Sequence, residues 1–291
     1  EAFDREVRVL FDDGNGLIAG GSFHHVGERE IQGVARWDGV AWQAIGDGLA
    51  GVVNAITLQN GSLVAAGGFE RSGSRSVREV AWWDGSAWQQ LGTGLSQGAN
   101  TVAIWNGELY VGGGLLFTGF PTAYVARLAS DGTWQPVGQS LGHIVYALTV
   151  YNNELIAGGY FSSNSTNCRF IARFDGTLWQ PLGGDQLNGL GQRVLALATR
   201  GPDLIAVGEF ATTWGPAPMP LSHIGRWDGA HWHALDAGLD SSTTALLATQ
   251  TAIYAGGTFL HAGGQISAYL ARWSCTCYPN CDGSSTAPTL N

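Results

Sequence analysis

The sequence contains no lysine, and all 14 of its basic residues are arginine. A chain without lysine cannot use a lysine as a Schiff-base nucleophile or as a catalytic base. Charged residues make up only 13% of the chain, and the excess of acidic residues gives a net charge of −9. An acidic chain without a basic stripe binds nucleic acids and anionic membranes poorly, so we expect neither as a partner.

Long apolar runs and a leader sequence are also missing. No run of 18 or more apolar residues occurs, so we expect no membrane insertion. The chain starts at Glu1, without methionine and without a charged and then apolar segment. We therefore expect a secreted or cell-surface protein whose signal peptide has been removed.

Cysteine is scarce, and three of the four cysteines lie within seven residues of one another near the C-terminus: Cys275, Cys277 and Cys281, with Cys168 apart from them. The C-x-C-x3-C spacing lacks the second pair of ligands that a zinc site requires. Disulfides in an exported protein are the favoured interpretation of all four. Their pairing stays open, because four cysteines allow three full connectivities.

Motifs of known catalytic sites are absent as well. The sequence has no G-x-S-x-G, H-E-x-x-H or P-loop pattern, and its seven histidines are scattered. Cys168 is expected to lie in a polar loop, without an evident partner for copper or nucleophilic chemistry.

Glycine and tryptophan are abundant, at 44 and 12 residues, and both follow an internal repeat. A glycine recurs at the end of an apolar run, and an arginine recurs about 15 residues later. The glycines are Gly21, Gly67, Gly113, Gly159, Gly208 and Gly257. The arginines are Arg36, Arg127, Arg173, Arg226 and Arg272, with Trp82 in the second copy. Successive spacings of 46, 45, 46, 53 and 46 residues place six copies along the chain.

Each copy holds four short runs of strand-forming residues, with an Asp-Gly dipeptide such as Asp175-Gly176 between the third and fourth. Asp-Gly between apolar runs indicates a hairpin, because the turn requires positive φ. We therefore predict an all-β fold, a six-bladed β-propeller with four antiparallel strands per blade over residues 1–281. The blades are expected approximately at residues 1–49, 50–95, 96–141, 142–190, 191–239 and 240–281.

The double glycine, the aromatic-Asp run and the tryptophan about five residues later resemble the kelch repeat. The sequence pattern Gly-Gly-x-Phe…Ile-Ala-Arg-Trp-Asp-Gly is also similar to repeats of secreted bacterial (planctomycete-type) propeller proteins. Ser130–Trp134 partly resembles the Asp-box turn of sialidases. The resemblance covers residues 1 to about 273. It implies the fold and leaves the activity open, because kelch-like propellers serve many functions.

The end of the chain is expected to complete the sixth blade. Tyr278 follows Trp273 at the spacing that separates Trp42 from Trp37, so residues 274–281 are predicted to form its outer strand. Pro279 is compatible with an edge strand, and cysteines bonded within this segment would hold the blade together.

Residues 282–291 are expected to form a tail that resembles the start of a dockerin-like, EF-hand-like segment. The resemblance implies that Asn280, Asp282 and Ser284 would be calcium ligands, although the loop stops before a late carboxylate. The competing interpretation is a polar tail without bound metal. Calcium, at the tail or on the propeller, is the one cofactor that we consider.

The recurring arginines and tryptophans are interpreted as framework, because a site is built from what differs between blades. The arginine is expected to bond carbonyls or the Asp of the Asp-Gly turn. Candidate binding residues lie instead in variable loops or at a variable position predicted to line the channel. They are Trp214 in the seven-residue insertion of the fifth copy, His24, His25, Tyr124 and His223 in loops, and Arg8 and Tyr146 at the channel position.

The channel position contains no pair of carboxylates for glycoside hydrolysis. We therefore expect a non-catalytic extracellular module that binds carbohydrate or protein, or assembles with itself. The alternative is a secreted hydrolase or lyase that acts on polysaccharide at the channel mouth.

Overall fold

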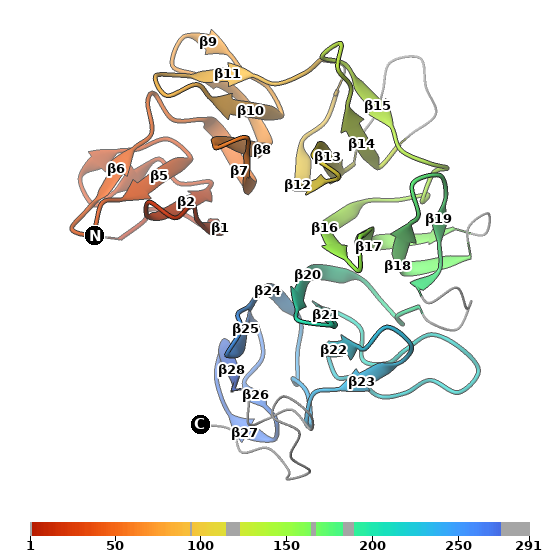
Figure 1. Ribbon diagram of the computed structural model, residues 1–291. Helices are drawn as coiled ribbons and strands as arrows, with labels where there is room; N and C mark the ends of the chain where they lie inside the picture. Colours follow the sequence, from red (N-terminus) through yellow and green to blue (C-terminus); the bar gives the residue numbers. More distant parts are fainter. Residues whose placement is uncertain (1, 94, 115–122, 164–166, 183–188, 275–291) are drawn as a thin grey trace. The chain divides into compact units, whose positions relative to one another are not determined.

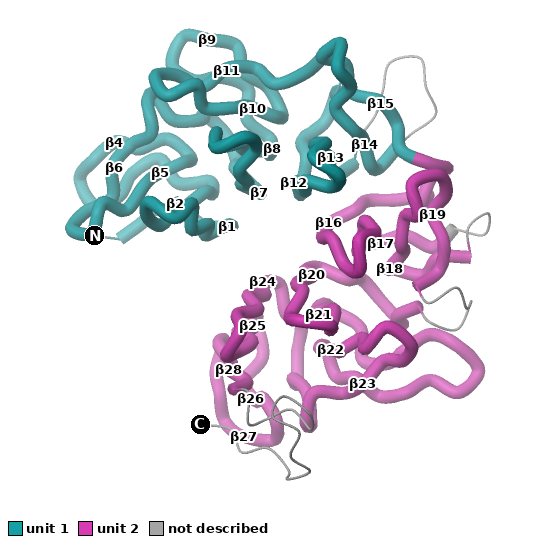
Figure 2. The backbone as a smooth tube through the Cα atoms, in the orientation of Figure 1, with its two compact units in different colours: residues 1–137 teal, residues 138–291 magenta. Residues whose placement is uncertain are grey.

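A computed structural model describes residues 2–93, 95–114, 123–163, 167–182 and 189–274. In these residues the secondary structure consists of strands and turns, without an α-helix. Accordingly, this part of the chain holds no helix capable of crossing a membrane. The chain divides into two compact units, residues 1–137 and 138–291, which have different colours in Figure 2.

Unit 1 contains three antiparallel sheets that follow one another along the chain (Figure 1). The first consists of β1 (Val7–Asp12), β2 (Leu17–Gly21), β5 (Val34–Trp37) and β6 (Trp42–Ala44). The second consists of β7 (Ala50–Gln59), β8 (Ser62–Ser72), β10 (Val80–Trp83) and β11 (Trp88–Gln90), and the third of β12 (Ala99–Trp105), β13 (Glu108–Gly113), β14 (Val125–Leu128) and β15 (Trp134–Pro136). Short strands between the second and third strands add small hairpins: β3 (His25–Val26) with β4 (Arg29–Glu30), and β9 (Arg75–Ser76) with β8.

Unit 2 repeats this plan. The fourth sheet consists of β16 (Val145–Tyr151), β17 (Glu154–Ser163), β18 (Cys168–Phe174) and β19 (Trp179–Gln180). The fifth consists of β20 (Val194–Arg200), β21 (Asp203–Gly208), β22 (Ile224–Trp227) and β23 (Trp232–Ala234). The sixth shows β24 (Thr243–Ala248), β25 (Ala252–Gly257) and β28 (Leu270–Ser274), with the hairpin β26 (His261–Ala262) and β27 (Gln265–Ile266) beside it. The outer strand predicted for residues 274–281 lies, after Ser274, outside the described residues.

A β-bulge recurs in the first strand of all six sheets. The register with the second strand shifts at Arg8, Asn54, Asn100, Tyr146, Leu195 and Thr244. These six residues make up the variable position that the sequence predicts to line the channel. A bulge leaves one residue without a direct partner across the ladder. The side chain at this position can therefore differ between the six sheets while their strand pairing stays the same.

The recurring glycine lies directly opposite this bulge, and the reason is steric. A Cβ atom on Gly67 would lie 2.0 Å from the Val52 carbonyl oxygen, and one on Gly208 would lie 2.1 Å from that of Arg193. Only a residue without a side chain tolerates such a close backbone approach.

The Asp-Gly dipeptides form the predicted turns. Gly39 and Gly85 both have φ of +98°. The Asp38 carboxylate accepts hydrogen bonds from the backbone amides of Val40 (2.8 Å) and Ala41 (2.9 Å), which closes the turn between β5 and β6. The hairpin prediction is therefore confirmed at these sites.

The recurring arginine is framework, but its partner differs from the expectation. Arg36 binds Asp13, and Arg226 Nη1 lies 2.8 Å from Asp203 Oδ1. Arg127 pairs with Glu108 and Arg173 with Glu154 in the same way. Each of these carboxylates lies in the turn before the second strand or at the first residue of that strand. The arginine lies on the third strand, and the two strands are neighbours in the sheet, so the two side chains meet. The Asp of the Asp-Gly turn is occupied by its own backbone amides.

Apolar side chains fill the spaces between successive sheets within each unit. In unit 1 one cluster joins Ile18 and Val34 of the first sheet to Ile56 and Trp88 of the second. The Trp88 indole is fully buried and donates a hydrogen bond to the Ile45 carbonyl (3.0 Å) of the preceding sheet. This contact supports the interpretation of the tryptophans as core.

Candidate functional site

Arg8 and Tyr146, predicted to line the channel, occupy equivalent bulge positions in different units. Arg8 donates to the Asn54 side chain (3.1 Å) and to Glu6 (3.1 Å), and Asn54 donates to the Ala99 carbonyl (3.0 Å). In unit 1 this position thus carries a hydrogen-bonded chain that links three sheets. Tyr146 is half-buried.

His24 and His25 follow β2 and belong to a turn that unit 2 repeats. Their backbone amides donate to Asp4 Oδ1 at 2.9 and 3.0 Å, and the His25 amide is the main cause that lowers the pKa of Asp4 to about 2. In unit 2, Asp240 Oδ1 accepts from the backbone amides of residues 260 and 261, and its Oδ2 lies 2.7 Å from His261 Nδ1. The recurrence of this turn favours a structural role for the two histidines.

Tyr124 and His223 occupy one and the same position, directly before the third strand. Their carbonyls accept hydrogen bonds from the recurring glycine amides, Gly113 to Tyr124 (3.0 Å) and Gly208 to His223 (3.2 Å). Across the six copies this position is filled by Gly33, Glu79, Tyr124, Phe170, His223 and Tyr269.

In unit 2 this position combines a bulky side chain with a left-handed backbone. φ is +62° at Phe170, +67° at His223 and +69° at Tyr269, and Glu79 at this position in unit 1 also has φ of +62°. Gly33 has the same conformation, with φ of +66°, at no steric cost. A bulky residue there costs about 1 to 2 kcal/mol, and such strain concentrates at functional sites.

Next to the strained position, aromatic and charged side chains gather on the fourth and fifth sheets. The Tyr160 ring stacks on Phe170 with centroids 6.2 Å apart and an interplanar angle of 21°, and His143 meets its edge at 4.8 Å. The Arg193 guanidinium lies 4.4 Å from the Tyr160 ring centroid and binds Glu209 at 3.2 Å. These contacts hold Tyr160 in one orientation while 40% of it stays exposed.

Trp214 is presented by the insertion in the fifth copy, as the sequence predicts, and is 43% exposed. Its backbone amide donates to the Gly189 carbonyl (2.9 Å), and the Thr213 amide donates to that of Met219 (2.9 Å). The Arg169 guanidinium lies 4.6 Å from the indole centroid and also binds the Ser162 hydroxyl. The indole is therefore fixed at the surface.

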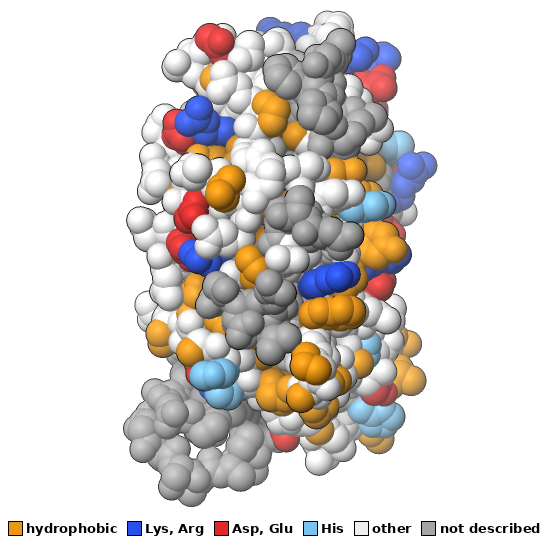
Figure 3. All heavy atoms as spheres, turned by 90° about the vertical axis from the view of Figure 1, so that its right-hand side faces the viewer, with side chains coloured by type: hydrophobic (Ala, Val, Ile, Leu, Met, Phe, Trp, Pro, Cys, Tyr) orange, Lys and Arg blue, Asp and Glu red, His pale blue; other side chains and the backbone are white. Residues whose placement is uncertain are grey.

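The two clusters are joined through consecutive residues of β18, because Arg169 contacts Trp214 and Phe170 contacts Tyr160. We call this surface the aromatic edge. It comprises His143, Tyr160, Arg169, Phe170, Arg193, Glu209 and Trp214. His223 and Tyr269 are added to it by their repeat position in the two following sheets, and not by a contact. On the face drawn in Figure 3, hydrophobic side chains are interspersed with arginines and histidines and do not form one apolar patch.

Reasoning from the sequence finds Trp214 and His223 but misses Tyr160, Phe170, Arg193 and Tyr269. A signal for them exists at two repeat positions. After the recurring glycine, the copies carry Ser22, Gly68, Gly114, Tyr160, Glu209 and Thr258. The first three copies have only small residues there, whereas the fourth has tyrosine, so comparing copies position by position singles out Tyr160 but does not show which residues lie beside it.

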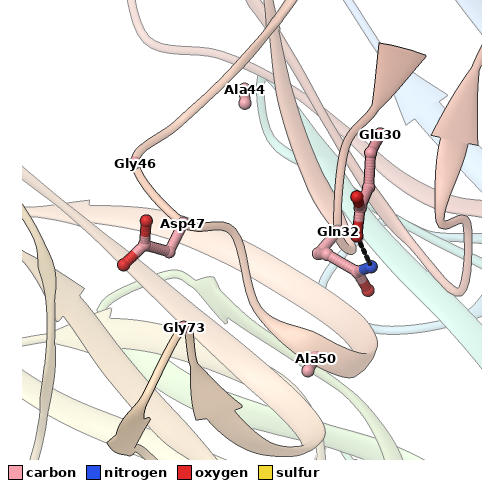
Figure 4. Close-up of a pocket in the computed structure, with 7 residues that line it drawn as sticks. All are labelled: Glu30, Gln32, Ala44, Gly46, Asp47, Ala50 and Gly73. Atoms are coloured by element: carbon pink, nitrogen blue, oxygen red, sulfur yellow. Dashed lines mark hydrogen bonds between the residues drawn. The ribbon is translucent and has the colours of Figure 1, made fainter.

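A separate shallow pocket of about 430 Å³ lies in unit 1, between the first two sheets (Figure 4). Glu30, Gln32 and Asp47 supply its polar side chains, and the Gln32 amide donates to Glu30 at 3.0 Å. Four small residues, two alanines and two glycines, complete the lining.

Cys168 is fully buried at the first residue of β18, so the prediction that it lies in a polar loop is wrong. It pairs in register with residue 163 of β17, which draws it into the sheet. Cys275, Cys277 and Cys281 lie outside the described residues, as do Asn280, Asp282 and Ser284. Within the described part of the chain, no group of three or more His, Cys, Asp or Glu side chains is arranged to hold a metal ion.

No family model matches the chain, and a search of curated proteins finds no similar one. Among solved structures, the WD40 β-propeller domain of Doa1 is similar with a TM-score of 0.62 at 12% identity, over 100% of this chain and 84% of that one. The computationally designed Ika8 protein has a TM-score of 0.49 at 15% identity, over 92% of each chain. The similarity to the Doa1 domain, together with six small antiparallel sheets, shows that the chain has the fold of a six-bladed β-propeller.

Proposed function

We propose that this protein is a non-catalytic binding module whose ligand contacts the aromatic edge. One observation carries the proposal: at a repeat position where the backbone is left-handed in both units, Tyr269 places an exposed aromatic side chain on a conformation that suits glycine, with φ of +69°. Packing does not explain Tyr269, since 63% of it is exposed. A strained and exposed aromatic residue is better explained by a ligand that contacts it.

The preorganisation of the edge supports binding. Arginine, tyrosine and tryptophan are the residues that most often dominate binding energy. Tyr160 and Trp214 are each held by an arginine over the ring, so little side-chain entropy remains to be lost when a ligand binds.

The chemistry of the edge favours binding over hydrolysis. The defined residues include one carboxylate, Glu209, which is already paired with Arg193. Glycoside hydrolysis by the common mechanism needs two carboxylates that flank the bond.

The setting that we propose is extracellular. It is supported by the resemblance of the repeats to kelch-like and secreted bacterial propellers, and by the cluster of cysteines near the C-terminus. Carbohydrate or protein is the ligand class that such a surface suits, and calcium at the dockerin-like segment remains part of this proposal.

Tyr269→Gly tests the proposal because it separates strain from function. Removing the side chain relieves the left-handed backbone, so we expect the free energy of unfolding to stay unchanged or to rise by up to about 1 kcal/mol. Binding to whichever ligand a glycan array or a screen of candidate partner proteins identifies should weaken about fivefold or more.

Tyr160→Ala should weaken the same binding. Leu178→Ser is a matched control, because Leu178 is 49% exposed in the turn between β18 and β19, at the opposite end of the fourth sheet. Binding that is unaffected by Tyr269→Gly, combined with a clear loss of stability, would show that the tyrosine is structural and would refute the proposal.

A further inference from the structure

We infer that the aromatic edge recognises an acidic sugar chain, with Arg169 as the residue that reads its carboxylates. This inference rests on the proposed function and adds the chemical class of the ligand.

The arginines of this protein differ in their partners. The framework arginines Arg36, Arg127, Arg173 and Arg226 each bind a carboxylate at the second strand. Arg169 differs from these four: among the described residues its partners are the Ser162 hydroxyl and the Trp214 ring, and none is a carboxylate. Arg272, the recurring arginine of the sixth sheet, lies 5.9 Å from the Tyr254 ring centroid, but it has no second partner that orients its guanidinium among the described residues. The full positive charge of Arg169 is therefore not neutralised by a neighbouring acid within the described part of the chain.

Stacking on Trp214 also orients the Arg169 guanidinium. The group presents five N–H donors in a planar fork, and the Ser162 hydroxyl accepts from one end of it. A guanidinium held between a ring and a hydroxyl keeps its other donors available to bind a carboxylate with two parallel hydrogen bonds.

The local charge points in the same direction. The edge holds two arginines against one carboxylate, in a chain whose net charge is −9. A locally positive surface on an acidic protein attracts an anionic ligand while the remaining surface repels it.

The form of the surface favours a sugar over an acidic peptide. Charged groups, Arg193 with Glu209 and Arg169, alternate with the exposed parts of Tyr160 and Trp214, so the edge offers ring atoms, donors and acceptors side by side. A protein-binding hot spot uses the same residue types in a centre from which the surrounding contacts exclude water, whereas Tyr160 and Trp214 are exposed over much of their surface. A sugar chain presents flat C–H faces between hydroxyl groups, which matches the alternating surface.

The test compares two polymers with the same backbone, polygalacturonate and its highly methyl-esterified form, by calorimetry on the full chain. We expect polygalacturonate to bind at least tenfold more tightly, with an affinity that falls as salt increases. Arg169→Gln should weaken this binding about tenfold, as expected for one charge-assisted bidentate contact. Arg169→Lys should recover part of the loss, because it restores the charge without the fork.

Arg71→Gln is the matched control. It removes one positive charge from an exposed position at the end of β8 in unit 1 and should leave binding unchanged. If Arg71→Gln weakens binding as much as Arg169→Gln, the effect is general electrostatics and the inference is overturned.

Three other outcomes also overturn it: equal binding of the two polymers, no binding of polygalacturonate, or equally tight binding of poly-glutamate, which would indicate an acidic peptide. These outcomes leave the proposed function intact if Trp214→Ala and Tyr269→Gly still weaken binding of another ligand. The proposed function fails separately if those two variants alter no binding at all.

Discussion

A backbone carbonyl lies so close to each recurring glycine that a side chain has no room there. The Cβ of an alanine at Gly67 would sit 2.0 Å from the Val52 carbonyl oxygen, which belongs to the backbone of β7 and cannot move alone. The next residue, Gly68, has nothing within 4 Å of the equivalent position. Gly67 therefore has no space for a side chain, whereas Gly68 does.

Gly67→Ala is expected to lower the free energy of unfolding by about 2 to 4 kcal/mol, because the clash displaces the β7 backbone at its bulge. Gly68→Ala should change it by less than about 0.5 kcal/mol. Urea denaturation of both variants measures the difference. Equal effects of the two substitutions would contradict the steric explanation.

At the scale of the element, the hairpin between third and fourth strands is closed by an ionised aspartate in each of the first five sheets. In the second sheet, Asp84 accepts from the backbone amides of residues 86 and 87 and from the Gln89 side chain. These hydrogen bonds hold the pKa of Asp84 well below its ordinary value of 3.8, and the bond from the Ala87 amide has the largest effect. The pKa values of Asp38, Asp131, Asp175 and Asp228 in the equivalent turns are lowered too.

This predicts how stability depends on pH. A carboxylate with a lowered pKa in the folded state stabilises the fold above its unfolded pKa, near 4, and that contribution is lost as pH falls through the folded pKa. Asp84→Asn should therefore lower the melting temperature at pH 7, and the gap to the natural protein should narrow between pH 4 and pH 2.

Glu28→Gln serves as the control for that measurement. Glu28 is exposed in the turn between β3 and β4, and its carboxylate has no hydrogen-bond partner among the described residues. The melting temperature of the Glu28→Gln variant should follow that of the natural protein from pH 7 to pH 2. A constant gap for Asp84→Asn across the pH range would be evidence against the role of the charge.

At the scale of the whole molecule, tryptophans connect successive sheets within a unit. In unit 1 the indole of Trp88 donates to the Ile45 carbonyl at 3.0 Å, and that of Trp134 donates to the Leu91 carbonyl at 3.2 Å. Each bond spans 43 residues of sequence, one sheet to the next. The same tryptophans fill the apolar space between the sheets.

Trp88→Phe should lower the free energy of unfolding by about 1 to 3 kcal/mol, since it leaves the buried Ile45 carbonyl unsatisfied and removes part of a fully buried ring. The far-ultraviolet circular dichroism should not change, because the strands themselves keep their hydrogen bonds. Trp37→Phe, at a half-buried position that contacts Trp42, should have the smaller effect in the same urea titration. The reverse order would refute the proposed role of the indole.

Much of the fold could be predicted because its determinants are local. The strands follow from apolar runs, and the hairpins from Asp-Gly, whose glycines do have positive φ. The partners of the arginines could not be predicted in the same way. Arg36 binds Asp13, 23 residues away, and that pairing depends on which strands are neighbours in the sheet.

The candidate site was predicted only in part for the same reason. Trp214 stands out as an insertion, and its exposure could be anticipated. The strain at Phe170 could not, because φ depends on a bulge whose residues look ordinary in the sequence. His25 was expected to be a binding residue, and its hydrogen bond to Asp4 became visible only once the chain was folded.

The sequence by itself determined the six repeats, the strands and their turns, because these depend on residues a few positions apart. Only the tertiary structure decided which variable residues form a surface. Arg193 reaches Tyr160 and Trp214 reaches Arg169 across 33 and 45 residues of chain. Such contacts arise when neighbouring sheets pack together and bring equivalent ends of their strands side by side, and no periodicity along the chain encodes that packing.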